Sequence, residues 1–148
     1  MFKRILLPTD GSPLSEIAIQ KGIQFAKTIN AKVIGIHVIP EFHVITLDPV
    51  MLEDTEDEFA RECKAKAEEY LGVIEKLAHE AGVPCETSYV VNDHPDEAIV
   101  NFAKEAQCDL IAMASHGRSG IRSILIGSVT QKVLARATGP VLVLRSTA

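Results

Sequence analysis

The sequence predicts an α/β fold: one open, five-stranded, mainly parallel sheet sandwiched between helices. Two observations predict it. Five short apolar segments alternate with longer segments of helical periodicity along the 148 residues. Most of these segments are also continuously hydrophobic, which is typical of parallel strands covered on both faces. No repeat or change in composition divides the sequence, so we expect a single domain over residues 1–148.

The expected strands are short apolar runs bounded by turn-forming residues. They cover residues 5–7, 32–39, about 85–91, 109–114 and 141–144. The connections between them are long enough for right-handed helical crossovers, which make successive strands parallel.

Four helices are expected in the connections between strands. In the first, Ser12 is a good N-cap, Pro13 suits the first helical position and Asn30 ends the helix. The others are expected over about 53–81, from 95 onward, and over about 128–137, after an irregular stretch at 40–52. In the first and second helices we expect these side chains to face inward: Leu14, Ile17, Ala18, Phe25, Ile29, Phe59, Cys63, Tyr70, Ile74 and Leu77.

The charge of the chain argues against nucleic acid as a partner. The formal net charge is -5 and the sequence pI is about 5.5. No long run of Lys and Arg supplies the cationic field that a phosphate backbone requires. A small anionic ligand remains compatible with this charge, because backbone N–H groups bind phosphate without a basic surface.

The N-terminal apolar run and the cysteines indicate the compartment. The run stops at Pro8 and Asp10, which is too short for a secretion signal or a membrane span, so we expect no membrane association and a cytoplasmic location. Cys63, Cys85 and Cys108 are far apart and lack metal-ligand spacing. We expect three small, at least half-buried thiols in a reducing compartment.

The loop after the fourth expected strand is the best candidate for a ligand site. Ligands of such sheets bind beyond the carboxyl ends of the strands, where the strand order reverses. This loop leads to Gly127 and Ser128, which open a helix whose first N–H groups can bind an anion. The alternative is that Ser128 is only an N-cap and the glycines only turn residues. The pattern is neither a Walker motif nor a dinucleotide fingerprint.

Over nearly its whole length the sequence resembles the universal stress protein family. The shared segments are ILLPTDGS at 5–12, HVI at 37–39, MASHGRSG at 113–120, GSV at 127–129 and PVLV at 140–143. The ATP-binding branch is marked by Gly, two residues, Gly, nine residues, then Gly-Ser or Gly-Thr. Gly117, Gly127 and Ser128 fit this spacing, whereas Ala114 replaces the first glycine. The resemblance implies a Rossmann-like fold with strand order 3-2-1-4-5.

The resemblance also implies an ATP site. Asp10 would accept a hydrogen bond from a ribose hydroxyl, with capping of the first helix as its alternative role. The backbone of Val38 would contact the adenine edge, although Val38 also suits a plain core strand. Gly117 and the N–H groups that follow would hold ribose and α-phosphate. The implied site residues are Pro8, Thr9, Asp10, Val38, Met113, Ser115, His116, Gly117, Arg118, Ser119, Gly120, Gly127, Ser128 and Val129.

The β- and γ-phosphates would lie at the start of the last helix, at residues 127–129. No carboxylate cluster is evident there, so Mg²⁺ or Mn²⁺ would be held through the phosphates and no residue is expected to bind the metal directly. We expect His116 and His37 to be hydrogen-bonded structural residues, because neither has an evident carboxylate partner for catalysis.

Three functions are compatible with this site. The first is an ATP-binding regulatory protein of the stress response that acts as a nucleotide-dependent switch. The alternatives are a slow ATPase and a nucleotide-free interaction module of the same fold. The resemblance implies a homodimer through the last strand, and the apolar residues of that strand fit an open sheet edge: Val141, Leu142, Val143 and Leu144. The apolar stretch at 42–52 is expected to be either a lid over the site or a subunit contact.

Overall fold

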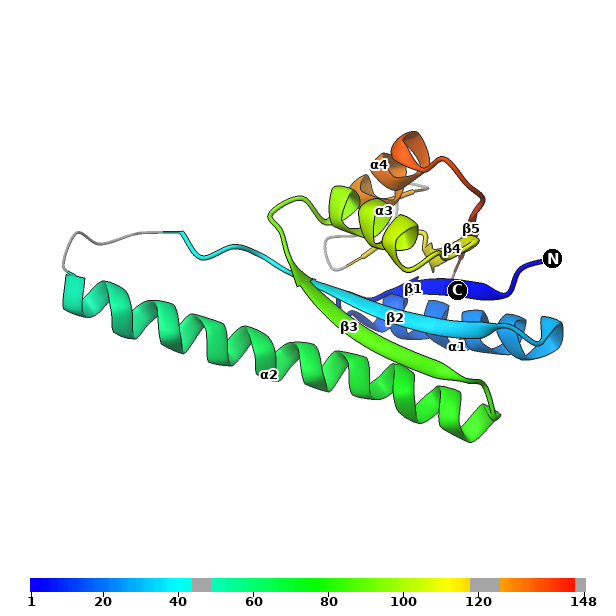
Figure 1. Ribbon diagram of the computed structural model, residues 1–148, viewed down its shortest axis with the longest axis horizontal. Helices are drawn as coiled ribbons and strands as arrows, with labels where there is room; N and C mark the ends of the chain where they lie inside the picture. Colours follow the sequence, from blue (N-terminus) through cyan, green and yellow to red (C-terminus); the bar gives the residue numbers. More distant parts are fainter. Residues whose placement is uncertain (44–48, 118–125, 146–148) are drawn as a thin grey trace.

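The computed structural model describes the backbone of residues 1–43, 49–117 and 126–145, and their side chains except those of 49–54. It confirms the α/β fold expected from the sequence (Figure 1). The elements in chain order are β1 (Arg4–Pro8), α1 (Pro13–Ile29), β2 (Lys32–Ile39), α2 (Pro49–Ala81), β3 (Cys85–Val91), α3 (Pro95–Glu105), β4 (Leu110–Ala114), α4 (Ser128–Arg136) and β5 (Val141–Leu144).

The five strands form one parallel sheet in the order β3-β2-β1-β4-β5, as predicted. The chain builds outward from β1 through β2 to β3 and then returns to the other side of β1 for β4. The strand order therefore reverses between β1 and β4. The pairing of β1 with β2 ends at Pro8 and Ile36, whereas β2 and β3 stay paired as far as Ile39 and Val91.

Helices cover both faces of the sheet. Figure 1 shows α1 and α2 together on one face and α3 and α4 on the other. The side chains of β1 alternate between these layers: Ile5 and Leu7 pack with α1 and α2, and Leu6 packs in the core beneath α3 and α4. All three are fully buried. This explains why the strand is apolar at every position rather than at alternate ones.

The ends of α1 form as the sequence predicts. The Ser12 hydroxyl accepts a hydrogen bond from the Ser15 N–H at 3.2 Å, and Asn30 ends the helix in the left-handed conformation with a φ of 59°. The predicted inward face is wrong at Ile17, which is 36% exposed. The buried stripe instead runs through small and β-branched residues: Ser15, Ala18, Ile19, Gly22, Ile23 and Ala26.

Helix α2 begins at Pro49, earlier than the predicted start near 53. Proline suits the first turn of a helix, where its missing N–H has no intrahelical acceptor. The helix continues past the carboxyl edge of the sheet (Figure 1). Phe59 and Cys63, which were expected to face inward, are only partly buried. The buried positions lie nearer the C-terminus: Ala67, Leu71, Ile74 and Ala78.

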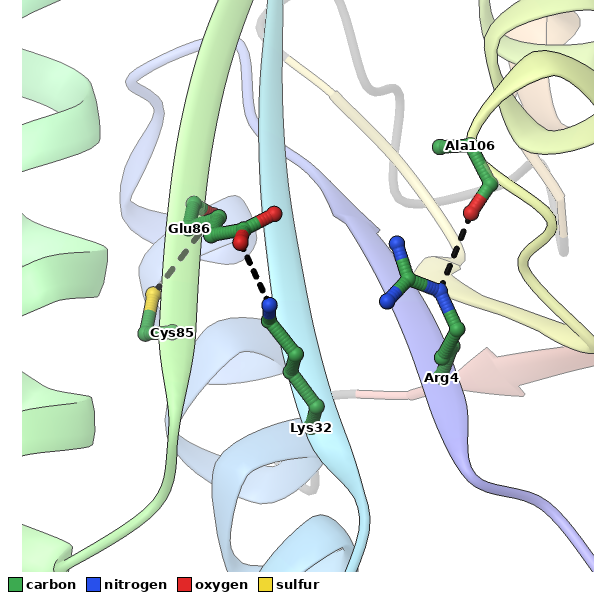
Figure 2. Close-up of polar contacts among 5 residues, drawn as sticks. All are labelled: Arg4, Lys32, Cys85, Glu86 and Ala106. Atoms are coloured by element: carbon green, nitrogen blue, oxygen red, sulfur yellow. Dashed lines mark hydrogen bonds and ion pairs between the residues drawn. The ribbon is translucent and has the colours of Figure 1, made fainter.

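Polar contacts fasten the strands near their amino ends (Figure 2). Lys32 of β2 forms an ion pair with Glu86 of β3, and this contact lowers the pKa of the Glu86 carboxyl. The Arg4 Nε donates to the Ala106 carbonyl oxygen at 3.0 Å, which ties β1 to the end of α3. The predicted cleft lies at the opposite edge of the sheet, so these contacts belong to the scaffold.

The three cysteines are free and partly buried, as expected. In Figure 2 the Cys85 sulfur lies near the Glu86 carbonyl oxygen, 3.6 Å away. Burial, together with the nearby carboxylates of Glu75 and Glu86, raises the pKa of Cys85 to about 11. This thiol stays protonated at neutral pH and is a poor nucleophile.

An ion pair joins the two helices of the second layer. The Arg136 Nε of α4 lies 2.7 Å from a carboxylate oxygen of Asp96 in the first turn of α3, and Asp96 is only 4% exposed. A buried carboxylate of this kind is costly unless paired, so the pair fixes how α3 and α4 lie against each other. No helix in the described part of the chain has the length and apolar character needed to cross a membrane.

Candidate functional site

A cleft of about 340 Å³ lies at the carboxyl ends of β1, β2 and β4, beside the first turns of α3 and α4. This is the reversal point of the strand order, where open α/β sheets bind their ligands. The volume falls within the range of roughly 300–1,000 Å³ that small-molecule sites occupy. The cleft is therefore the candidate functional site.

Most residues implied by the family resemblance line this cleft. They are Pro8, Thr9, Asp10, Val38, Met113, His116, Gly117, Gly127, Ser128 and Val129. Ser115 is buried and does not line the cleft; its carbonyl oxygen accepts a hydrogen bond from the Gly127 N–H at 2.6 Å. Arg118, Ser119 and Gly120 lie outside the described residues, as does the segment 44–48 of the apolar stretch for which a lid or a subunit contact was expected.

Sequence reasoning missed part of the lining. The missed residues are Ser15, Ile36, His37, Pro95, Ile99 and Thr130, and Ala114 was noted only as a departure from the motif. Pro95 and Ile99 are four residues apart and therefore share one face of α3. That spacing, together with the crossover of α3 over the sheet, could have predicted that both residues line the cleft.

The backbone of Val38 faces the cleft because β1 is shorter than β2. The Thr9 N–H donates to the Ile36 carbonyl oxygen at 2.9 Å, and the chain then turns into α1. In a parallel strand, alternate residues direct their N–H and C=O groups toward the same neighbour. Val38 therefore directs its donor and acceptor toward the side that β1 has left. This geometry is compatible with both roles expected of Val38, strand residue and backbone contact.

Asp10 uses one carboxylate oxygen to organise the start of α1. Its Oδ1 accepts hydrogen bonds from the Ser12 N–H at 2.9 Å and from the Ser15 hydroxyl at 2.7 Å. Its Oδ2 lies against Gly117 at the far wall of the cleft, so close that a Cβ at 117 would overlap it. Asp10 thus has the capping role, and its second oxygen reaches the cleft.

The glycines of the loop after β4 are needed for close packing. At Gly127 a Cβ would lie 3.3 Å from both the His116 Cα and the Ser115 carbonyl oxygen, tighter than an ordinary contact. Ala114 lies in β4, and it is not among the described residues with a positive φ. An alanine at this motif position therefore causes no backbone strain.

The N-terminus of α4 opens onto the cleft. Gly127 is its N-cap, and no described side chain caps the helix. The N-cap is therefore Gly127 and not Ser128. The Thr130 hydroxyl donates instead to the Ala114 carbonyl oxygen at 2.8 Å, which fixes α4 to the end of β4. The first-turn N–H groups of α4 and the positive end of its dipole form a site suited to an anion.

Both histidines of the cleft wall are hydrogen-bonded, as expected. The His37 Nδ1 lies 2.8 Å from the Thr9 carbonyl oxygen and so carries the proton of that bond. The His116 Nδ1 lies 3.1 Å from the Ser115 hydroxyl oxygen. Among the described residues, no group of three or more His, Cys, Asp or Glu side chains could hold a metal ion.

Comparison with known proteins assigns the chain to a family. The sequence model of the universal stress protein family matches residues 1–145. The chain belongs to the universal stress protein family. It is 36% identical to universal stress protein MJ0577 of Methanocaldococcus jannaschii, over 98% of this chain and 96% of that protein. It is 34% identical to universal stress protein MJ0531 of the same organism, over 98% and 83%.

Solved structures of universal stress proteins share the fold. The structure of MJ0577 superposes with a TM-score of 0.84 at 33% identity and covers 100% of this chain and 99% of that one. A universal stress protein in complex with cAMP superposes with a TM-score of 0.72 at 28% identity, over 99% of each chain. The order of strands in our chain is thus the family arrangement, and at least one relative binds a nucleotide.

The contact between Asp10 and Gly117 predicts a coupled mutational effect. Replacing Gly117 with Ala forces the pinned Asp10 carboxylate to move, and such overpacking costs about 1–3 kcal/mol. The cost should largely disappear in an Asp10→Ala background, where the carboxylate is gone. Urea unfolding of the four proteins of this cycle measures the coupling.

Gly139→Ala is the matched control, because a Cβ there meets nothing within 4 Å. It should change the free energy of unfolding by less than about 0.5 kcal/mol. If Gly117→Ala lowers the free energy of unfolding equally in the wild type and in the Asp10→Ala background, residues 10 and 117 are not in contact.

Proposed function

We propose that this universal stress protein binds ATP, accompanied by Mg²⁺ or Mn²⁺, in the cleft at the carboxyl edge of the sheet. One observation carries the proposal: the open backbone of Val38 and the open N-terminus of α4 line the same cleft. The first is suited to a base edge and the second to a chain of phosphates. Residues 1–148 would act as one nucleotide-binding domain.

The Val38 backbone would select adenine. The Watson–Crick edge of adenine has an amino donor beside a ring acceptor, which complements one C=O and one N–H of the same residue. Guanine presents its oxygen acceptor where adenine has the amino donor. Apolar side chains of the cleft would pack against the base: Ile36, Pro95, Ile99 and Met113.

The phosphates would be held by main-chain N–H groups of α4 and the Ser128 hydroxyl. The residues present fit such a group, since Gly127 keeps the entrance to the helix free of a side chain and Ser128 is exposed. Asp10 would accept a hydrogen bond from a ribose hydroxyl through its Oδ2. The divalent ion would be bound through the phosphates and would reduce their mutual repulsion.

The cAMP complex of a relative supports an adenine nucleotide as the ligand class. We extend this to ATP because Gly117, Gly127 and Ser128 keep the spacing of the ATP-binding branch. The proposed role is a nucleotide-dependent switch in the stress response rather than rapid turnover, in a dimer that pairs through β5.

Calorimetric titration with Mg²⁺ and each of ATP, AMP, cAMP and GTP tests the ligand. ATP should bind at least about 10-fold more tightly than GTP, because guanine leaves the Val38 groups unpaired. Ser128→Ala should weaken the binding of ATP by about 10-fold, which is the cost of one hydrogen bond to a charged group. The affinity for AMP should not change.

Thr138→Ala is the control, since Thr138 is exposed beyond the far end of α4. Gly127→Val should abolish binding while the circular dichroism spectrum stays native. Equal affinities for ATP and GTP would refute the Val38 contact, and absence of ATP binding would refute the function.

The dimer prediction rests on the outer edge of β5. The Ser115 N–H donates to the Leu144 carbonyl oxygen, and the Ile111 N–H donates to the Pro140 carbonyl oxygen. The even-numbered residues of β5 therefore direct their backbone N–H and C=O groups toward β4. Val143 therefore directs its N–H outward. Val143→Pro removes an outward donor without breaking the bonds to β4, and it should turn a dimer into a monomer in sedimentation velocity.

Tyr89→Pro is the matched control, because Tyr89 occupies the equivalent outward position on β3, the opposite edge. It should remain dimeric. A monomeric wild type, or a dimer that Tyr89→Pro dissociates and Val143→Pro does not, would show that β5 is not the interface.

A further inference from the structure

The turn of residues 9–11 is contacted from two sides. It joins β1 to α1 and forms one wall of the cleft through Thr9 and Asp10. On the cleft side the Asp10 Oδ2 lies against Gly117. On the opposite side the turn meets α2, a helix whose described side chains, from residue 55 onward, do not line the cleft.

The contact with α2 is made by the ring of Tyr70. Gly11 has a φ of +80°, and a Cβ on it would overlap ring atoms of Tyr70. Glycine is thus required at this position twice, for its backbone conformation and for the closeness of the ring. Tyr70 is itself held in place because its neighbours Leu71 and Ile74 are buried against the sheet.

His37 connects the same ring to the turn by a second route. Its ring packs edge-on against Tyr70, with centroids 5.1 Å apart and planes at 77°. Its Nδ1–H donates to the Thr9 carbonyl oxygen at 2.8 Å. Tyr70 therefore touches residue 11 directly and is linked to residue 9 through His37, so that its ring fixes the turn on both sides of Asp10.

We propose that Tyr70 is a positioning residue: it holds the turn of residues 9–11 so that Asp10 faces the nucleotide, and it thereby couples nucleotide occupancy to α2. The inference rests on the proposed function and adds the path by which binding leaves the cleft. Because α2 extends past the edge of the sheet (Figure 1), a change at Tyr70 would reach the part of this helix that lies beyond the sheet. Such coupling is reciprocal, so loosening α2 must weaken binding.

Tyr70→Leu and Tyr70→Phe separate the ring from the hydroxyl. Loss of the ring should weaken ATP binding by up to about 10-fold, whereas Tyr70→Phe keeps the ring and should bind ATP more tightly than Tyr70→Leu. Hydrogen exchange supplies a readout that a purely structural role would not move. Saturating ATP should slow exchange at residues 64–75 of α2 in wild type and in Tyr70→Phe but not in Tyr70→Leu. Protection at 128–131 should persist in all three.

Tyr89→Leu is the matched control, since Tyr89 is exposed on β3, and it should behave as wild type. If Tyr70→Leu fails to fold, His37→Asn removes the ring that packs on Tyr70, keeps an N–H for Thr9, and carries the same expectation for α2. If Tyr70→Leu binds ATP with the affinity of the wild type and shows the same protection of α2, the coupling is refuted but the proposed function is not. Absence of ATP binding by wild type would refute the proposed function, and the coupling with it.

Discussion

The early end of the central strand is the constraint on which the rest of the site depends. β1 stops pairing with β2 at Pro8 and Ile36, while β2 continues to Ile39. If β1 were longer, its backbone would form hydrogen bonds with the N–H and C=O of Val38. No cleft would then open where the strand order reverses. The Asp10 carboxylate stabilises the turn that follows the strand, because it accepts hydrogen bonds from the Ser12 N–H before α1 and from the Ser15 hydroxyl in its first turn. The same side chain reaches the cleft with its second oxygen.

The far wall of the cleft is packed so closely that a side chain at either of two positions would have to displace its neighbours. Gly117 leaves room for Asp10, and Gly127 lets the loop after β4 return to within hydrogen-bonding distance of Ser115. These glycines have structural reasons that hold without a ligand, so their presence alone does not establish binding. What they create is an α4 N-terminus free of any described side-chain cap. The proposal of a phosphate site rests on that opening.

The elements were predictable because continuous apolar strands and good caps such as Ser12 and Asn30 are local signals. The burial of helix faces was less predictable. Ile17 is exposed and Ala67 is buried, because a helix packed on both a sheet and another helix buries small residues that hydrophobicity does not distinguish. The motif-bearing wall of the cleft could be inferred from resemblance. The α3 wall and the direction of the Val38 backbone depend on crossover and register, which only the assembled sheet fixes.

The central claim is that Val38 and the start of α4 bind the two ends of one nucleotide, and a crystal structure grown with ATP and Mg²⁺ tests it most directly. The account predicts the adenine edge within hydrogen-bonding distance of the Val38 N–H and C=O, with phosphates at the N–H groups of Ser128 and Val129. A cleft that contains only solvent at millimolar ATP, or a base bound away from Val38, would contradict it.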